Sequence, residues 1–494
     1  MAIDEPVVPL RRERVGRRMS WEMVIGLEIH VQLRTAEKLF CSDETVFGAA
    51  PNSRVCPVCL GLPGALPVLN GEAVDLAIVA ALGLDCQVHE VSVFARKSYF
   101  YPDLPKGYQI TQFSEPLATE GTVLVDSEGA VHPIRIRRIH MEEDAGKSIH
   151  DRISGSTAVD LNRAGVPLVE IVTEPDLRSP TQARTFLQEL KRTLEYLDVS
   201  DCNMEEGSLR VDANVSLWPE GAEEYGVKTE VKNLNSFSAV ERSVVAEAKR
   251  QTAILEAGGE IVQETLLWDE RDGTLRSMRS KEESHDYRYF PDPDLPPLRI
   301  DPERIRQLQA ELPELPAQRL MRLMEEHDLD GNDVEVLIAS RSLADYFEAL
   351  AEIVGEAKAA ANWVRGPLLK ETNRVQRSVD DLAIRPASLA ELIGLVEDGT
   401  VSGTMGRKVL GKMVDSGKTA REIIETEGLS QVQDSDELNA WADAVIEENS
   451  DEVERYRSGE TRLIGYFVGQ TMKKSQGRAD PKALSALLRG RLDE

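Results

Sequence analysis

The sequence predicts an α+β protein, in which a mostly antiparallel sheet is followed by regions built only from helices. Apolar and polar side chains alternate strictly at residues 25–33 and again at residues 209–217, which is the period of a strand with one buried face. Beyond about residue 301 this alternation gives way to helical periodicity in Ala, Leu and Glu. A proline-rich run at residues 291–297 separates the two patterns, because proline continues neither a helix nor a sheet ladder.

The first predicted strand places Glu28 and His30 on its polar face. One interpretation of this face is the solvated outer side of a sheet. The later alternating strand carries Arg210 and Asp212 in the same way, and an acidic segment, HMEEDAGK, begins at His140. If these strands share one sheet, their polar side forms a carboxylate-lined surface suited to a hard cation such as Mg²⁺.

The cysteines follow the spacing of part of a zinc site. Cys41 precedes a Cys-x-x-Cys pair, Cys56 and Cys59, and Asp43 is the nearest candidate for a fourth ligand. Three buried thiols without a metal are the alternative. Five cysteines in 494 residues also indicate a reducing cytoplasm rather than a disulfide scaffold.

Composition excludes several classes of protein. No apolar run approaches the ~20 residues of a membrane helix, so no membrane association is expected. Residues 1–18 are basic but lack an apolar core, which predicts a disordered extension and not a secretory signal. The net charge of −28 argues against nonspecific nucleic-acid binding driven by bulk charge, although local basic patches remain compatible with it.

An aromatic and basic segment, KSYFYPDLPKGYQ, occupies residues 97–109. Its aromatic rings can stack on a base while its lysines contact phosphates; a rigid turn that fills the core is the alternative. Further on, Glu170 stands in an apolar strand, where a carboxylate is rarely left unpaired.

Standard nucleotide-binding signatures are absent from the sequence. The segment at residues 146–148, GKS, ends like a P-loop, but Met141 occupies the position of its first glycine. An ATP site would therefore depend on carboxylate-held Mg²⁺ and basic residues, which is sufficient for phosphoryl transfer. Near the C-terminus, Lys473 and Lys474 follow the sequence GYFVG, where they could contact a phosphate backbone or lie on a solvated helix surface.

Six motifs in order resemble the B subunit of the glutamyl/aspartyl-tRNA amidotransferase GatCAB, the GatB/GatE family. The resemblance runs from about Trp21 to the C-terminus. The motifs occupy residues 24–33, 99–112, 140–147, 204–210, 232–236 and 286–291.

This resemblance implies a cradle-like catalytic domain at residues 19–300, a helical domain at 301–412 and a YqeY-like, tRNA-binding tail at 413–494. It also implies a ligase that forms carbon–nitrogen bonds, active in a heterotrimer with a glutaminase A subunit and a C subunit. The B subunit would use ATP to phosphorylate the side-chain carboxylate of Glu-tRNA(Gln) or Asp-tRNA(Asn), and ammonia from glutamine would then displace phosphate. The sequence lacks a recognisable amidase arrangement such as Ser-Ser-Lys, so the ammonia would have to come from another subunit.

The resemblance also implies roles for individual residues. Glu28, His30 and one of two adjacent glutamates, Glu142 in preference to Glu143, would hold Mg²⁺. Arg210 and Asp212 would complete the catalytic set. Contacts to ATP, substrate or the acceptor end would come from Glu143, Glu205, Glu206, Lys97, Tyr99, Lys106 and Tyr108.

One position departs from the pattern of zinc-bearing relatives, which have Cys-x-Cys before the Cys-x-x-Cys pair. Here Asp43 replaces the second cysteine. The sequence therefore does not decide whether a structural zinc is bound by Cys41, Asp43, Cys56 and Cys59. Two other functions remain open on the sequence. One is a noncatalytic tRNA-binding module, and the other is a zinc hydrolase built around the cysteines and His30.

Overall fold

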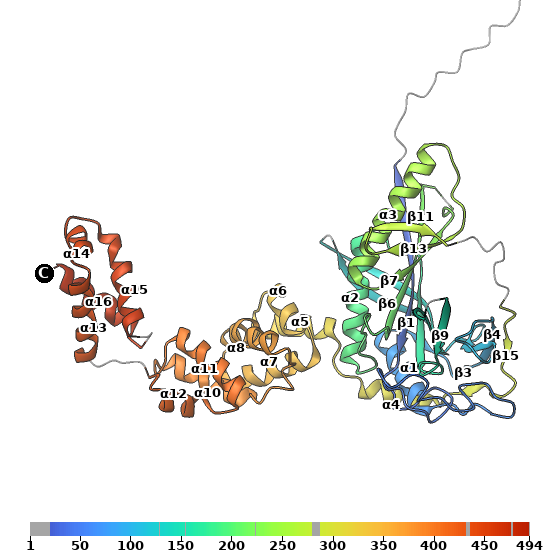
Figure 1. Ribbon diagram of the computed structural model, residues 1–494, viewed down its shortest axis with the longest axis horizontal. Helices are drawn as coiled ribbons and strands as arrows, with labels where there is room; N and C mark the ends of the chain where they lie inside the picture. The colour runs from blue at the N-terminus through green and yellow to red at the C-terminus, as the bar shows by residue number, and fades with distance from the viewer. Residues whose placement is uncertain are drawn as a thin grey trace, which may run out of the picture. The chain divides into compact units, whose positions relative to one another are not determined.

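The computed structural model describes residues 20–278, 287–430, 435–475 and 478–493, apart from residues 128, 154 and 223. The extension predicted at residues 1–18 lies outside the described residues, and so does Asp286 of the last motif. The chain divides into two compact units, Met1–Leu315 and Pro316–Glu494 (Figure 1).

A nine-stranded sheet forms the frame of the first unit, and β1 (Trp21–Gln32) lies at its centre. The strand order is β14-β13-β12-β11-β1-β10-β7-β6-β2. Neighbouring strands are antiparallel except for β12 and β13, which confirms the predicted, mostly antiparallel sheet. The other strands are β2 (Gln87–Val88), β6 (Ala118–Ser127), β7 (Ala130–Glu143), β10 (Pro167–Thr173), β11 (Leu209–Pro219), β12 (Thr229–Leu234), β13 (Thr265–Asp269) and β14 (Thr274–Ser277).

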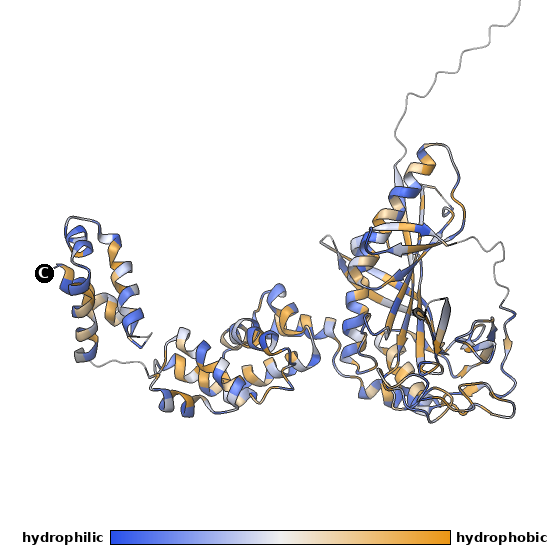
Figure 2. Cartoon of the chain, in the orientation of Figure 1, coloured by the Kyte–Doolittle hydropathy of each residue, from blue (hydrophilic) through white to orange (hydrophobic). Residues whose placement is uncertain are grey.

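One face of this sheet packs into the main hydrophobic core. The apolar side chains of β1 at positions 25, 27, 29 and 31 are all buried in it. Helices α2 (Pro180–Tyr196) and α3 (Phe237–Glu256) belong to the same core, and Figure 2 shows both hydrophobic and hydrophilic residues along them. The Ser179 side chain caps α2 by accepting a hydrogen bond from the backbone N–H of Gln182. The helices thus leave the polar face of the sheet open for other residues.

Shorter elements complete the first unit. The aromatic and basic segment connects β4 to β5, and β5 reaches β7 through a hydrogen bond from Gln109 Nε2 to the Glu143 carbonyl oxygen, at 2.7 Å. These elements are β3 (Val91–Ser92), β4 (Phe94–Ser98), β5 (Tyr108–Gln112), β8 (Lys147–Ile153), β9 (Ser156–Asp160), β15 (Phe290–Pro291), β16 (Leu298–Arg299), α1 (Gly71–Gly83) and α4 (Pro302–Glu311).

The second unit contains only helices among its described residues, which confirms the α+β class. Its helices are α5 (Pro316–His327), α6 (Gly331–Leu337), α7 (Arg341–Val354), α8 (Ala357–Trp363), η1 (Val364–Leu368), α9 (Leu369–Val375), α10 (Pro386–Glu397), α11 (Gly403–Ser416), α12 (Ala420–Glu427), α13 (Ser435–Glu448), α14 (Ser450–Arg457), η2 (Thr461–Leu463), α15 (Ile464–Lys474) and α16 (Pro481–Asp493). No helix in the described ranges is long and apolar enough to cross a membrane.

A separate small hydrophobic core joins α13 to α16 and extends from Leu438 to Leu492. The predicted boundary after residue 412 falls within α11, and the one after residue 300 falls just before α4. The division into catalytic, helical and tail domains stays a prediction.

Candidate active site

Strand pairing brings the predicted polar residues to one face of the sheet. His30 of β1 is opposite Glu170 of β10 on one side and Arg210 of β11 on the other. Glu28 is likewise opposite Asp212. Because directly paired residues of antiparallel strands point to the same face, segments far apart in the sequence contribute to one site.

Glu170 lies between two imidazoles at the centre of this site. Its Oε2 is 3.4 Å from His30 Nε2 and 3.2 Å from His140 Nε2. His30 Nε2 is also 3.3 Å from Glu142 Oε1. Two groups of candidate metal ligands result, Glu28/His30/Glu170 and His140/Glu142/Glu170, with the ligand atoms of each within 4.8 Å of one another. Glu170 belongs to both groups.

The charges in this cluster depend on each other. Burial raises the pKa of Glu28, and the neighbouring Glu170 carboxylate raises it further. Burial lowers the pKa of His30, but its hydrogen bond to Glu170 and the nearby Glu142 outweigh this and raise it to about 9. Burial likewise opposes ionisation of Glu170, yet His140 and His30 hold its pKa well below the usual range. At neutral pH the metal-free site therefore contains a His30 cation and a Glu170 anion.

The other two predicted catalytic residues are each held by an oppositely charged partner. Arg210 Nη2 lies 2.9 Å from Asp144 Oδ2, which also accepts a hydrogen bond from Gln32 Nε2 at 2.9 Å. Asp212 Oδ2 is 2.6 Å from Lys232 Nζ. Fixed ion pairs thus orient both side chains at the edge of the cluster.

Lys97 is the predicted ATP-contacting residue whose charge is linked to the cluster. Burial lowers its pKa, but the carboxylates of Glu142 and Glu170 outweigh this and raise it, so its ammonium stays charged. Its Nζ lies 5.0 Å from the ring centroid of Tyr287, which also packs edge-on against Tyr99 at 6.1 Å.

Lys106 pairs instead with Glu143, whose Oε1 also accepts a hydrogen bond from the backbone N–H of Ile110 at 2.9 Å. Lys106 Nζ lies 5.6 Å from the ring centroid of Tyr108. Glu143 belongs to neither ligand group of the described chain, and Glu142, the glutamate preferred from the sequence, belongs to one.

The structure leaves two of the predicted residues outside the cluster. Glu205 and Glu206 are exposed in the turn before β11, where their backbone N–H groups donate hydrogen bonds to Asn203 Oδ1. Within the described ranges, neither candidate ligand group includes them.

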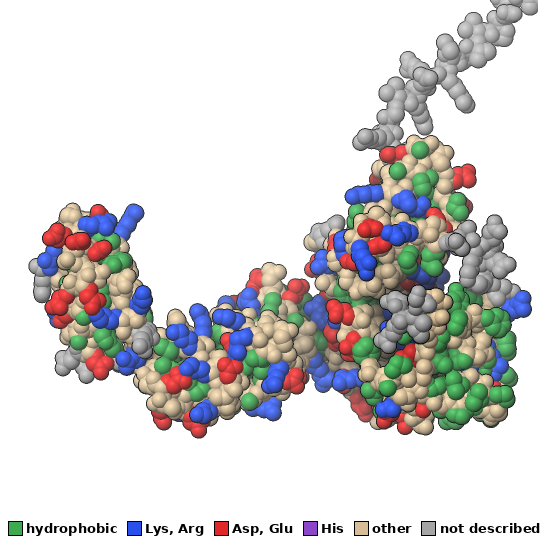
Figure 3. Space-filling view, in the orientation of Figure 1, with side chains coloured by type: hydrophobic (Ala, Val, Ile, Leu, Met, Phe, Trp, Pro, Cys, Tyr) green, Lys and Arg blue, Asp and Glu red, His purple; other side chains and the backbone are tan. Residues whose placement is uncertain are grey.

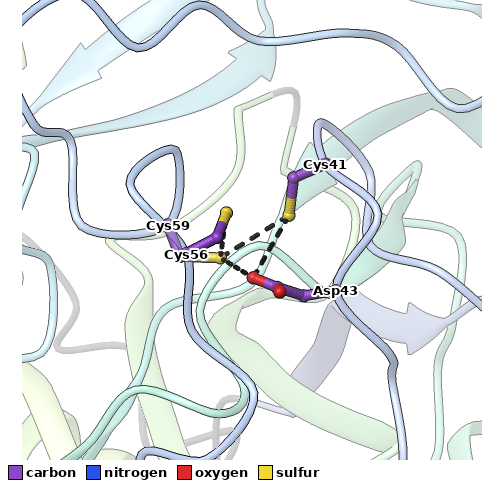
Figure 4. A group of neighbouring side chains, drawn as sticks. All are labelled: Cys41, Asp43, Cys56 and Cys59. Atoms are coloured by element: carbon purple, nitrogen blue, oxygen red, sulfur yellow. Dashed lines mark hydrogen bonds between the residues drawn. The ribbon is translucent and has the colours of Figure 1, made fainter.

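Cys41, Asp43, Cys56 and Cys59 form a third group of candidate ligands, separate from the two carboxylate groups (Figure 4). Cys59 Sγ lies 3.6 Å from Cys41 Sγ, 3.8 Å from Cys56 Sγ and 3.1 Å from Asp43 Oδ2, and Cys41 Sγ lies 3.6 Å from the same oxygen. Donors at the corners of a zinc tetrahedron, with bonds of ~2.3 Å to sulfur and ~2.0 Å to oxygen, lie roughly 3.5–3.8 Å apart. The four side chains therefore fit a zinc ion, with Asp43 in place of a cysteine.

A lysine that the sequence did not single out lies against this group. Lys38 is fully buried, and its Nζ donates hydrogen bonds to the Arg54 carbonyl oxygen at 2.7 Å and to Cys59 Sγ at 3.3 Å. A buried ammonium requires a nearby anion. A hydrogen bond from Cys41 lowers the pKa of Cys59, burial opposes this, and the nearby Lys38 ammonium acts in the same direction as Cys41, so that the pKa is about 6. Cys59 is therefore a thiolate at neutral pH.

Comparison with known families gives the context for these sites. The model of the GatB/GatE catalytic domain matches residues 23–306, and that of the GatB domain matches residues 345–492. The chain belongs to the GatB/GatE family.

Curated GatB/GatE relatives match nearly the whole chain. Proteins named as the B subunit of aspartyl/glutamyl-tRNA(Asn/Gln) amidotransferase are 51% identical over 476 residues in Prosthecochloris aestuarii and 50% identical over 476 residues in Carboxydothermus hydrogenoformans. In both comparisons the alignment covers 96% of this chain and 99% of the relative. A third such protein, from Persephonella marina, is 49% identical over 472 residues, covering 95% of this chain and 99% of its own length.

In this GatB/GatE chain, several site residues are positioned by strand pairing, which no local sequence pattern predicts. The apolar strand around Glu170 predicts only that this carboxylate needs a partner, and does not predict its place in the site. The sequence places His140 and Asp144 in the acidic segment and Lys232 in the motif at residues 232–236, but it assigns none of the three a role in the site. Nothing in the sequence marked Lys38, because buried and exposed lysines have the same local pattern.

The raised pKa of His30 predicts a pH dependence for the metal-free GatB/GatE chain. Protonated His30 stabilises the fold fully below its ordinary pKa of 6.5, and this contribution is lost as the pH rises through about 9. In urea denaturation with a chelator present, we expect the free energy of unfolding to fall over this interval. A His30→Gln variant should lose this part of the slope; an identical profile in both proteins would contradict the assignment.

Proposed function

We propose that this chain is the B subunit of a tRNA-dependent amidotransferase. It phosphorylates the side-chain carboxylate of Glu-tRNA(Gln) or Asp-tRNA(Asn) with ATP, and ammonia then displaces phosphate to give Gln-tRNA(Gln) or Asn-tRNA(Asn). The observation that carries this proposal is Glu170, placed between His30 and His140 with Glu28 and Glu142 nearby, in a chain whose relatives carry that name along almost their whole length.

The proposed chemistry uses Mg²⁺, for which Glu28, His30 and Glu142 are the assigned ligands and Glu170 is a fourth candidate. Carboxylate oxygens suit this cation, and when bound it neutralises charge on the phosphates of ATP. His30 must lose its proton before its Nε2 can serve as a ligand. Lys97 and Arg210 hold positive charge beside the cluster, where it counters charge on a phosphate or on the substrate carboxylate.

Other residues of the proposed site orient the substrates. Tyr99, Lys106 and Tyr108 are assigned to ATP or the tRNA acceptor end, and Glu143 keeps Lys106 in place. Asp212 is held by Lys232. Glu205 and Glu206 are assigned to incoming substrate from their exposed turn.

The proposed assembly is a heterotrimer with a glutaminase A subunit and a C subunit, and glutamine is the amide donor. The chain itself lacks a recognisable amidase motif, so its ammonia has to come from a partner. The five cysteines are free thiols, which fits a reducing compartment such as the cytoplasm.

The Cys41, Asp43, Cys56 and Cys59 group is assigned to a structural zinc. It shares no residue with either carboxylate group. A zinc hydrolase that combines the cysteines with His30 is therefore not favoured. A noncatalytic tRNA-binding module is not favoured either, because such a protein has no need for buried glutamates between two histidines.

Reconstitution tests the proposed function. The trimer of A, B and C subunits should convert Glu-tRNA(Gln), Asp-tRNA(Asn) or both to the amide when each is supplied separately with ATP and glutamine. No amide product from either tRNA would overturn the proposal.

The predicted tail domain gives a second expectation. Removing the residues after about 413 should raise the KM for tRNA by at least tenfold and leave the KM for ATP within about twofold, because the ATP site is assigned to the first unit. Steady-state kinetics of tRNA-dependent ATP hydrolysis would measure both constants. Equal increases would count against a tRNA-gripping tail.

A further inference from the structure

Residues 45–69 form a loop made of turns, which is called the cysteine loop here because it carries Cys56 and Cys59. Figure 3 shows hydrophobic side chains gathered at the lower right of the first unit. Side chains that face outward contribute little packing energy to holding a loop in place. The position of the cysteine loop therefore depends on its cysteines and on contacts made by its backbone. Five of its large hydrophobic side chains are 48–74% exposed: Val46, Phe47, Leu62, Leu66 and Val68.

A hydrogen-bonded turn connects the two cysteines of this loop to Gly61. The backbone N–H of Leu60 donates to the Cys56 carbonyl oxygen at 3.1 Å, and that of Gly61 donates to the Val58 carbonyl oxygen at 3.0 Å. Gly61 has φ +62°, in the left-handed region that favours glycine. The turn thus fixes where Gly61 lies relative to Cys56 and Cys59.

Gly61 lies directly against Lys106 of the candidate active site. A Cβ atom at position 61 would lie 2.5 Å from Lys106 Cγ and 3.0 Å from its Cα, closer than non-bonded carbon atoms normally approach. Any larger side chain at position 61 therefore has to displace Lys106. The Lys106 ammonium pairs with Glu143, and the two side chains are only 8% and 3% exposed. A buried ion pair of this kind depends on its geometry, so a small displacement of Lys106 weakens it.

The glutamate of this ion pair is connected to the same cysteines by a second route. Gly165, with φ +89°, lies between Lys38 and Glu143, because a Cβ atom there would lie 3.4 Å from Lys38 Cδ and 4.0 Å from Glu143 Oε2. Lys38 Nζ in turn donates a hydrogen bond to Cys59 Sγ at 3.3 Å. Both partners of the ion pair thus lie against residues that are fastened to the cysteines.

We propose that Gly61 is a positioning residue for the candidate active site. Because it has no side chain, the cysteine loop closes on Lys106 and holds the Lys106 ammonium where it meets a phosphate. The inference rests on the proposed function, in which Lys106 is assigned to ATP or the acceptor end. ATP is the better match of the two, since its triphosphate presents the larger negative charge to an ammonium group. The cysteine loop then contributes to nucleotide binding through its shape, without contacting the nucleotide.

The test compares two glycines of the cysteine loop in the reconstituted trimer. Gly61→Ala should raise the Kd for ATP about tenfold in calorimetric titration with Mg²⁺ present, whereas Gly64→Ala should leave it within about twofold. Both glycines have positive φ, but a Cβ atom at position 64 meets nothing within 4 Å. Both substitutions should lower the Tm, because both strain the backbone. Lower stability therefore does not explain a change in ATP affinity that is confined to position 61.

A double variant shows whether the effect acts through the lysine. Lys106→Ala should itself raise the Kd for ATP about tenfold, and Gly61→Ala/Lys106→Ala should bind ATP no more weakly than Lys106→Ala, because the ammonium is already gone. If Gly61→Ala alone does not fold, recovery of folding in the double variant would support the contact, since Lys106→Ala removes the Cγ atom. Failure to recover would count against it.

Three outcomes of the titrations would overturn the inference: wild-type ATP affinity in Gly61→Ala, equal changes in Gly61→Ala and Gly64→Ala, or fully additive losses in the double variant. Wild-type ATP affinity in Lys106→Ala would overturn it as well, because Lys106 would then lie outside the ATP site. Failure of the proposed function is distinguishable, because only then does the wild-type trimer form no amide product.

Discussion

Replacing Glu170 with glutamine is expected to lower the rate of tRNA-dependent ATP hydrolysis by about 10²–10³-fold, the size of effect seen when one group that stabilises transition-state charge is removed. Glu170 is the carboxylate common to both ligand groups, and the amide keeps its volume but not its charge. Two histidines then lose the anion between them. ATP hydrolysis with mischarged tRNA measures the effect, and tRNA affinity should stay within about threefold, under ~1 kcal/mol.

A fully buried glutamate outside the site provides the control for this experiment. Glu247 of α3 pairs with Arg250 on the core side of the sheet. Glu247→Gln should therefore lower stability but leave ATP hydrolysis per folded molecule unchanged. Glu28→Ala should abolish hydrolysis, an effect at least as large as that of Glu170→Gln. Wild-type rates in both site variants would show that the metal assignment is wrong.

Removing the assigned zinc is expected to have the largest effect on stability. Structural zinc contributes directly to folding free energy, since the ligands form no site in the unfolded chain. Cys59→Ser should reduce bound zinc from about one ion per chain to none and lower the Tm by several degrees, with a strong chelator producing the same shift in the wild type. Metal analysis and thermal denaturation provide the two readouts.

Lys38→Met gives a finer version of this test. It removes the buried ammonium but keeps a side chain of similar length, so Cys59 should hold its proton more tightly and compete less well for zinc. We expect zinc affinity at pH 7 to fall about tenfold in competition with a chromophoric chelator, corresponding to ~1.4 kcal/mol. A full complement of zinc in Cys59→Ser, or an unshifted Tm with chelator, would contradict the structural zinc.

The sequence predicted which face of a strand each side chain occupies better than it predicted which strands lie next to one another. Alternation alone placed Glu28 and His30 on a polar face, because side-chain direction along a strand is a local property. The pairing of Glu170 with His30 depends on which strands meet and in which register, and no local pattern specifies that. Glu205 and Glu206 show a different limit. Their motif is recognised from the sequence, but both side chains are exposed in the turn before β11.

The central position of β1 has a consequence for how the protein is made. Its partners are β10 and β11, which end at Thr173 and Pro219, so the ribosome has to add roughly 190 more residues before both edges of β1 can be paired. At synthesis rates of about 5–20 residues per second, at least one edge of β1 stays open for on the order of 10–40 s. Long-range pairing of this kind forms slowly, and an alternating strand with an open edge is prone to aggregate. We therefore expect the nascent chain to be prone to aggregation until β11 has been translated, and a chaperone that binds unfolded chains would protect it during this interval.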